Sequence, residues 1–316
     1  MSTLPLRRVL VLLLDRVHLL DLAGPVQALY EANGFGANYE LHHVAQTPKI
    51  VTGQGLTLSD LEALPTPHAT DLVLIPGMES STLHKLEVPG RWLREAHAAG
   101  ATLASICSGA FALARAGLLD GRQCTTHWKL TERLQKEFPA ARVHENRLYV
   151  EDSRVLTSAG VAAGIDLALA LLEAEHGPLM VAKVAREMVV YLRRSGDHGQ
   201  ESIYLDHRTH LHPGVHRVQD WLVQHPEEKP TLERLGRLAA MSPRNLTRVF
   251  QKATGITPKR FAAQVKLQVA KDLSQNPELT VDEIASRCGF ADARQLRRLW
   301  KQSFGSTLSS MRRGAA

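Results

Sequence analysis

The stretch Ala-Thr-Leu-Ala-Ser-Ile-Cys-Ser-Gly-Ala, residues 101–110, places a short apolar run directly before a helical pattern. Residues 101–106 are apolar enough and short enough to predict a buried strand, and residues 109–116 have helical spacing. Cys107 lies at the junction, with small residues on both sides. A sharp turn from strand to helix that presents one side chain is the logic of a nucleophile elbow. The stretch therefore predicts a layered fold with a candidate site at the end of a strand.

Short apolar runs alternate with helical segments on both sides of this stretch. Continuous apolar strands between helices are typical of a parallel sheet that helices cover on both faces. We therefore predict a layered, flavodoxin-like α/β domain over residues 1–195. The expected strands are 9–14, 39–45, 71–75, 101–106 and 155–158, and the expected helices are 22–33, 89–99, 109–116, 161–175 and 179–193.

The composition changes after residue 195. Residues 196–213 are polar, rich in His and Gly and without a clear period, which predicts a linker. Residues 214–316 show only helical patterns and are predicted to form an all-α domain. The net charge of +6 is unevenly distributed, with 18 Lys and Arg against 9 Asp and Glu in residues 214–316, and 20 against 23 before them. The basic character belongs to the last third and favours an anionic partner there.

Length and composition exclude several classes of protein. The 316 residues, 44% of them hydrophobic, suit two domains better than one, because single cores tend to stop growing near ~250 to ~300 residues. The apolar run 9–14 is too short for a secretory signal, and no stretch approaches the ~20 apolar residues of a membrane span. The three cysteines form neither a disulfide framework nor a zinc ribbon pattern. We expect a cytoplasmic protein that does not associate with a membrane.

The tail contains a weak internal repeat of two helix-turn-helix units. In the first unit, Ser242 is an N-cap and Pro243 occupies the first helical position of the second helix. In the second unit, Thr280 and Glu283 form a capping box, and Gly289 supplies the permissive turn residue. Each unit is therefore expected to present a second, recognition helix.

The second helix of each unit carries side chains suited to DNA. Arg matches guanine, and Asn or Gln matches adenine, while the same residues can also grip phosphates. A solvated basic surface is the alternative for any single Arg-rich helix, but its repetition at matching places favours DNA recognition. The predicted DNA-binding residues are Ser242, Arg244, Asn245, Thr247, Arg248, Lys252, Arg294, Gln295, Arg297, Arg298 and Lys301.

Residues 214–316 resemble the DNA-binding domain of AraC/XylS-family transcription regulators. The resemblance rests on LAAMSPRNLTRVFQKATGITPKRF (238–261) and LTVDEIASRCGFADARQLRRLWKQSFGSTLSSMRR (279–313). It implies two helix-turn-helix units joined by a long helix, binding to double-stranded promoter DNA, and RNA polymerase as a further partner. Two departures, Ala291-Asp292 and Leu308, affect the expected sequence preference rather than the fold.

Residues 8–192 resemble the ThiJ/PfpI group of the class I glutamine amidotransferase-like superfamily, in the form fused to AraC-type tails. The matching pieces are LLLDRVHLLDLAGPVQAL (12–29), DLVLIPG (71–77), ICSGAFALARAGLLDGRQCTTHW (106–128) and LTSAGVAAGIDLALALLE (156–173). The resemblance places Cys107 at the elbow and an acidic residue near the thiol. The ligand pocket that it implies comprises Asp21, Gly77, Cys107, Ser108 and His127.

Three functions remain open for the first domain. The resemblance favours a sensor, not an enzyme, in which the pocket binds a small-molecule effector and two protomers pair as a homodimer. The alternatives are a Cys107-dependent hydrolase or hydratase, with His127 and Asp21 as catalytic partners, and a thiol redox sensor. A helix N-terminus favours the thiolate that either alternative needs, whereas a buried structural cysteine is common.

Metal and cofactor sites are weakly indicated. His207, His210 and His212 have a spacing that can bind a metal, but they lie in the predicted linker without an acidic or Cys partner. Gly53-Gln54-Gly55 lacks the third glycine of a dinucleotide loop. We expect neither a metal nor a cofactor.

Overall fold

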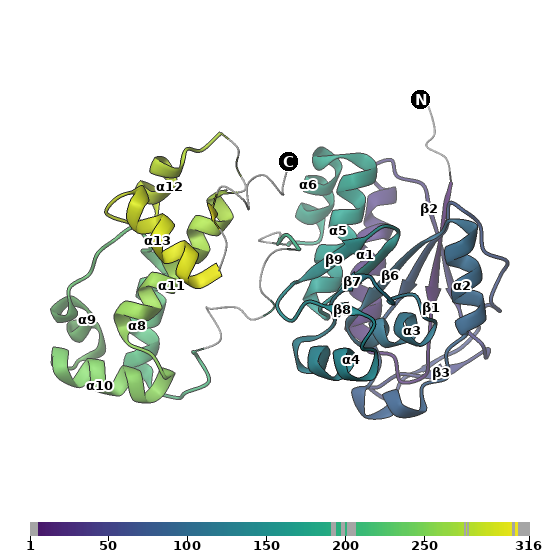
Figure 1. Cartoon of the computed structure of the whole chain (residues 1–316), viewed down its shortest axis with the longest axis horizontal. Coiled ribbons are helices and arrows are strands. Elements are labelled where there is room, and N and C mark those ends of the chain that lie inside the picture. Colours follow the sequence, from purple (N-terminus) through teal and green to yellow (C-terminus); the bar gives the residue numbers. More distant parts are fainter. Residues whose placement is uncertain are drawn as a thin grey trace. The chain divides into compact units, whose positions relative to one another are not determined.

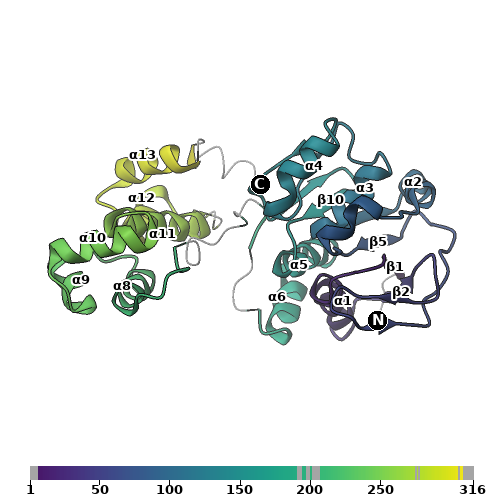
Figure 2. The same cartoon turned by 90° about the horizontal axis from the view of Figure 1, so that it is seen from below.

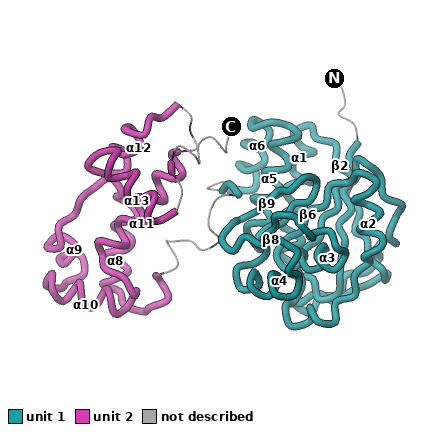
Figure 3. Tube along the Cα trace, in the orientation of Figure 1, with its two compact units in different colours: residues 1–200 teal, residues 201–316 magenta. Residues whose placement is uncertain are grey.

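The computed structural model describes residues 6–190, 194–196, 200, 207–274, 276, 278–304 and 307–308. It divides into two compact units, residues 1–200 and 201–316 (Figure 3). The division falls inside the range expected to be a linker. Among the described residues, no helix is both long and apolar enough to cross a membrane.

The first unit is built on a six-stranded sheet (Figures 1 and 2). The strand order is β2-β1-β5-β6-β10-β9, and all neighbouring pairs are parallel except β10 with β9. Its first five positions follow the flavodoxin-like order, in which the chain reverses direction across the sheet between β1 and β5. The strands are β1 Arg7–Leu12, β2 Tyr39–Val44, β5 Leu72–Ile75, β6 Thr102–Ile106, β9 Tyr149–Asp152 and β10 Val155–Ser158.

Helices cover both faces of this sheet, because alternate side chains of each strand enter opposite cores. Val9 and Val11 of β1 lie in a core with α1, α5 and α6, whereas Leu10 and Leu12 lie in a core with α2, α3 and α4. The helices are α1 Leu19–Asn33, α2 Gly90–Ala99, α3 Ala110–Arg115, α4 Thr131–Glu137, α5 Ala162–His176 and α6 Pro178–Glu187. The prediction of an α/β layered domain is confirmed.

Several elements differ from the sequence-based expectation. The antiparallel edge strand β9 and helix α4 were not expected, nor were the short pairs β3 Ile50–Val51 with β4 Thr57–Leu58 and β7 Gln123–Cys124 with β8 Arg142–Val143. The helix expected over 179–193 ends at Glu187, because Val189 adopts a φ of 54° that no helix tolerates; residues 191–193 lie outside the described residues. The unexpected strands and helix α4 are too short or too polar for hydrophobic periodicity alone to predict them.

The described residues of the second unit form helices joined by turns and loops, without a strand (Figure 1). Its helices are α8 Pro213–Gln224, α9 Leu232–Ala239, α10 Pro243–Thr254, α11 Pro258–Ser274, α12 Val281–Arg287 and α13 Ala293–Phe304. They enclose two separate cores, one around Phe250 and Phe261 and another around Trp300 and Phe290. Helix α11 contributes to both cores, so it connects two helix-turn-helix pairs.

Candidate functional site

The turn after β6 is the predicted elbow. Cys107 has a φ of 55°, and the 3-10 turn Cys107–Gly109 leads directly into α3. Such a backbone conformation is strained for a residue with a side chain, and it persists where surrounding structure enforces it. Here the Thr126 hydroxyl donates a hydrogen bond of 2.7 Å to the Cys107 carbonyl. Gly109 is required because a Cβ would overlap the Ile75 carbonyl at the end of β5.

The thiol of Cys107 is enclosed by close-packed backbone. A Cβ on Gly160 would lie 2.9 Å from Sγ, and a Cβ on Gly77 would lie 2.7 Å from the Cys107 Cβ. Only 6% of Cys107 is exposed. Glycine at these two positions lets the loops after β5 and β10 close over the elbow, so the thiol is covered rather than presented.

Asp21 on α1 lies beside the elbow and is fully buried. Its Oδ1 accepts a hydrogen bond of 2.6 Å from the Val161 amide, whereas its Oδ2 has no hydrogen-bond partner among the described residues. A Cβ on Gly77 would overlap that Oδ2 and would lie 2.7 Å from the Cys107 Cβ, so Asp21, Gly77 and Cys107 lie together. The carboxyl therefore ties α1 to the residue that precedes α5.

His18 completes this group, and the sequence analysis did not single it out. Its Nδ1 lies 3.6 Å from Asp21 Oδ2, and its amide donates to the Gly77 carbonyl at 2.8 Å. The signal that could have found it is its place at the N-cap of α1, three residues before Asp21. About a third of the His18 side chain is exposed, so it offers access to a group that is otherwise closed.

The electrostatics of this group oppose a reactive thiolate. Burial, with the Asp21 charge as a further cause, raises the pKa of Cys107 to about 12. Burial also raises the pKa of Asp21, although the Val161 amide and His18 act in the opposite direction. The expected lowering by the helix N-terminus is outweighed by desolvation. A thiol that stays protonated at neutral pH is a poor nucleophile and a slow redox sensor.

His127 and Ser108 are both engaged by neighbouring backbone, and His127 also lies within electrostatic range of Asp21. His127 caps the turn Trp128–Leu130, with Nδ1 accepting from the Lys129 amide at 3.3 Å, and no hydrogen bond joins it to Cys107 among the described residues. Ser108 is fully buried, and its hydroxyl both donates to and accepts from the Met78 backbone at 2.6 and 2.7 Å. His127 is therefore not positioned as a base for the thiol, and Ser108 ties two loops together instead of lining an open pocket.

Both predicted recognition helices in the second unit begin with a side-chain cap. The Ser242 hydroxyl accepts from the Asn245 amide at 3.4 Å, and Ala240 in the turn adopts a left-handed φ of 57°. In the second helix-turn-helix pair, the Asp292 carboxylate accepts from the Gln295 amide at 2.6 Å. Asp292 thus replaces a serine cap with a charged one, as an N-cap position permits.

The capping box predicted for the second helix-turn-helix pair is also present, at the start of α12. Thr280 and Glu283 each accept from the backbone amide of the other, at 3.2 and 2.7 Å. Gly289 adopts a φ of 66° in the turn before α13. These contacts match the turn chemistry expected from the sequence.

Most of the predicted DNA-binding side chains lie exposed on α10 and α13. The exposed members are Ser242, Arg244, Arg248, Lys252, Arg294, Arg297, Arg298 and Lys301. Leu246, Phe250, Leu296 and Trp300 are buried on the opposite faces of the same helices. The basic residues therefore form one solvent-facing row on each helix.

Three predicted base-reading residues are instead half-buried and engaged within the protein. The Gln295 Oε1 accepts from the Ala291 amide at 2.7 Å, and the Asn245 Oδ1 accepts from Arg248 at 2.9 Å. The Thr247 hydroxyl donates to the Pro243 carbonyl at 3.0 Å, within its own helix. These hydrogen bonds engage part of the polar capacity of each side chain, and the role of the three residues in DNA binding stays a prediction.

The histidines of the predicted linker cap and buttress α8. His212 accepts from the Val215 amide, and the His210 and His216 rings stack with centroids 4.3 Å apart. Within the described residues, no group of three His, Cys, Asp or Glu side chains is arranged to hold a metal.

Comparison with known proteins assigns both units. Residues 7–174 match the DJ-1/PfpI family. The chain belongs to this family. Residues 235–314 match a helix-turn-helix domain, the AraC-type module expected from the sequence.

The chain is similar over nearly all of its length to transcriptional regulators of Pseudomonas aeruginosa. It is 29% identical to the HTH-type transcriptional regulator GbdR, over 96% of this chain and 83% of GbdR. It is 27% identical to the HTH-type transcriptional regulator CdhR, over 95% of this chain and 90% of CdhR. Both relatives are transcriptional regulators by name, in agreement with the regulator expected from the sequence.

A solved structure supports the fold of the first unit. A ThiJ/PfpI family protein from Pseudomonas syringae covers 64% of this chain and 81% of its own, with a TM-score of 0.52 and 20% sequence identity. At that identity the likeness concerns the fold alone. This DJ-1/PfpI protein is a DNA-binding transcription regulator of the AraC/XylS type.

Proposed function

We propose that this regulator binds promoter DNA with α10 and α13 and that a small molecule bound to the DJ-1/PfpI unit controls it. The observation that carries the proposal is the pair of capped helices with exposed basic rows in one unit. Helices of this kind enter the major groove with their N-terminal residues near the base edges. Arg248 and Arg298, which occupy matching places on the two helices, are the proposed central contacts.

The engaged polar residues refine the proposed reading of bases. Arg248 is held by Asn245, so the two side chains form one unit that can approach a base pair together. The amide oxygen of Gln295 is occupied, and only its NH2 group remains to donate to DNA. The Asp292 carboxylate repels phosphate at the start of α13, whereas Ser242 does not at the start of α10. We infer that the first helix-turn-helix unit binds the backbone more tightly than the second.

The proposed effector site lies above the buried group around Asp21. Asp21 and Cys107 are sealed, so an effector contacts the groups around them that reach solvent, namely His18, His127 and Val161. Val161 is the N-cap of α5 with a φ of 50° and a ψ of −110°, a strained conformation for a β-branched residue. Strain of this kind is concentrated at ligand clamps and switches.

A route from this site to the rest of the chain follows from the same contacts. The Val161 amide is fixed by Asp21, so movement of the Gly160–Val161 turn shifts the start of α5 relative to α1. Helix α5 packs on α1 and α6, and α6 precedes the connection to the second unit. An effector regulates only if it binds two arrangements with different affinity. We propose that this turn distinguishes the two arrangements, that the protein acts as a cytoplasmic homodimer, and that RNA polymerase is its further partner.

Genome-wide mapping of bound DNA tests the proposal most directly. Reproducible sites near a defined set of genes are expected, and those genes identify candidate effectors by the chemistry they encode. Candidate metabolites would then be titrated against operator affinity for the wild type, His18→Ala, His127→Ala and the exposed control His84→Ala. Loss of response in the first two variants, with basal operator affinity retained, supports the site. Specific operator binding that no metabolite alters would refute effector control.

A further inference from the structure

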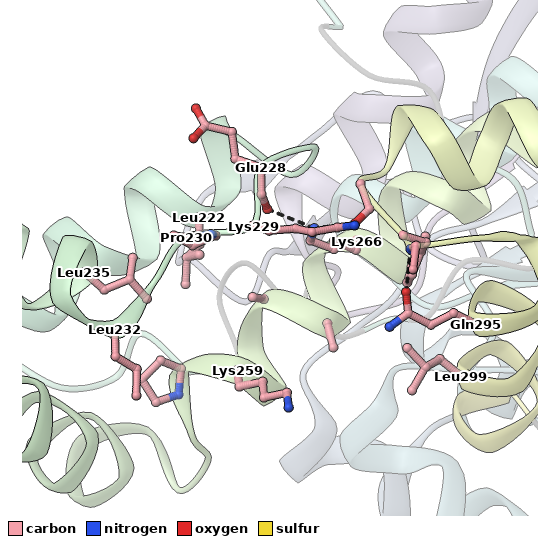
Figure 4. A pocket seen from close by; sticks show the side chains of 16 residues that line it. Leu222, Glu228, Lys229, Pro230, Leu232, Leu235, Lys259, Lys266, Gln295 and Leu299 are labelled. Atoms are coloured by element: carbon pink, nitrogen blue, oxygen red, sulfur yellow. Dashed lines mark hydrogen bonds between the residues drawn. The ribbon is translucent and has the colours of Figure 1, made fainter.

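The two helix-turn-helix units meet along a groove beside α11. The cavity of about 510 Å³ has Leu222, Leu232 and Leu235 on one side and Gln295 and Leu299 on the other (Figure 4). Phe290 also lines it. The two hydrophobic cores do not merge across it. Helix α11 contributes to both cores, so contacts at this groove add to the connection that the helix already makes.

One side chain of α11 crosses this junction. Lys266 follows Val265, which belongs to the first core, and precedes Leu267, which belongs to the second. Its ammonium donates to the Glu228 carbonyl at 2.9 Å, in the segment before α9, and to the Gly289 carbonyl at 3.0 Å, in the turn before α13. Figure 4 shows Lys266 reaching from α11 toward Glu228. A single cation thus joins the backbones of both units.

Gly289, whose carbonyl accepts from Lys266, also contacts the first helix-turn-helix pair directly. A Cβ on Gly289 would overlap the Glu227 carbonyl, so the turn of the second unit packs directly on the backbone of the first. Its φ of 66° also favours glycine. Burial and the Lys229 charge lower the pKa of Lys266, so the two carbonyls offset the cost of enclosing an ammonium there.

We propose that Lys266 and Gly289 form a brace that sets the spacing and angle between recognition helices α10 and α13. The inference rests on the proposed DNA binding and adds which residues make the two helices act together. Two recognition helices must match successive major grooves, about 34 Å apart, to bind at once. A loose junction would let each helix bind while removing the benefit of binding both. Lys266 is accordingly a positioning residue.

The test compares Lys266→Met with Lys259→Met. Methionine keeps the apolar stem and removes the ammonium, and Lys259 is an exposed lysine of the same helix that lines the same groove. Affinity would be measured for a mapped operator, for the same operator with one base pair inserted between its two subsites, and for a single subsite. For Lys266→Met we expect about tenfold weaker binding to the native operator, a smaller penalty for the insertion than in the wild type, and unchanged single-subsite affinity. Lys259→Met should lower affinity without changing the insertion penalty.

Two further measurements keep the brace open to refutation. Thermal unfolding checks that each variant folds. Gly289→Ala adds a Cβ that would overlap the Glu227 carbonyl and lie 2.8 Å from Lys266 Nζ, so it disturbs the same junction from the turn and should reproduce the loss of spacing dependence. Spin labels at Gln251→Cys on α10 and Gln302→Cys on α13 report the distance between the helices without DNA. Lys266→Met should broaden that distance distribution. An unchanged distribution together with wild-type spacing dependence would overturn the brace, whereas an intact brace in a protein without specific sites would overturn only the proposed function.

Discussion

The polar side chains of the two candidate sites differ mainly in their exposure to water. In the DJ-1/PfpI unit, Asp21 and Cys107 are enclosed, and burial raises the pKa of both toward their neutral forms. In the helix-turn-helix unit, Arg248 and Arg298 are exposed on capped helices. Reactive residue types thus become structural where they are desolvated, and common basic residues become an interface where a helix aligns them in water.

Salt should separate the two regions most strongly. Because phosphate contacts release counterions, operator affinity should fall about a thousandfold between about 50 and about 200 mM salt. The labelling rate of the buried thiols in the first unit should stay nearly constant, because neutral, enclosed groups are little screened. Fluorescence anisotropy and thiol-reagent kinetics measure the two quantities. An operator affinity that does not change with salt would contradict the proposal that the basic rows on α10 and α13 bind phosphates.

Removing one exposed arginine should have the next largest effect. Arg248→Ala or Arg298→Ala should each weaken operator binding by about 1 to 3 kcal/mol and relax the preference at one base pair. The control is Arg260→Ala, which removes the same charge from an exposed position on α11, outside both recognition helices. Binding to a panel of operator variants distinguishes the outcomes. Equal weakening on every sequence would reassign the arginine to phosphate.

The pH dependence of stability tests the buried carboxyl. Because the pKa of Asp21 is raised in the folded protein, the folded state binds its proton more tightly than the unfolded state does. This contribution to the free energy of unfolding is fully present below the unfolded pKa of about 4 and is lost as pH rises through the folded pKa. Asp21→Asn should abolish that loss, and exposed Asp120→Asn should not. Urea unfolding at several pH values gives the slopes, and identical slopes for wild type and Asp21→Asn would contradict the assignment.

The smallest effect is expected at Cys107 itself. With a thiol pKa of about 12 and an enclosed Sγ, Cys107→Ser should change operator affinity by less than about twofold, before or after mild peroxide treatment. Cys124→Ser is the matched control, because burial raises the pKa of that thiol to about 12 as well. A large loss of peroxide response in Cys107→Ser alone would restore the redox-sensor alternative.

Local patterns predicted much of the fold, because the causes of those elements lie within a few residues. The caps at Ser242 and Thr280 and the turn at Gly289 depend on neighbouring backbone groups, and all three are present. The strands of the parallel core were evident from apolar runs. Strand β9 was not predicted because it is short and mixes polar with apolar residues, and it is stabilised by pairing with β10.

The candidate site was predicted less completely than the fold. The residue types around Cys107 indicated an elbow, but His18 joins Asp21 only after α1 docks beside the loops that follow β5 and β6. Gln295 has a side chain suited to adenine, yet its oxygen is occupied by the Ala291 amide. Such engagements are invisible to a reading of residue types because they depend on the final path of the backbone.

The sequence by itself determined the two-part organisation, the paired recognition helices and the basic charge of the tail, since periodicity, caps and composition act locally. Only the tertiary structure decided that Cys107 is a buried thiol whose pKa is raised by burial and that Asp21 holds the turn before α5. It also decided that Lys266 joins two turns that are 61 residues apart in the chain. Burial and long-range hydrogen bonding arise only when distant segments of the chain meet. They give these side chains structural roles that their residue types alone do not predict.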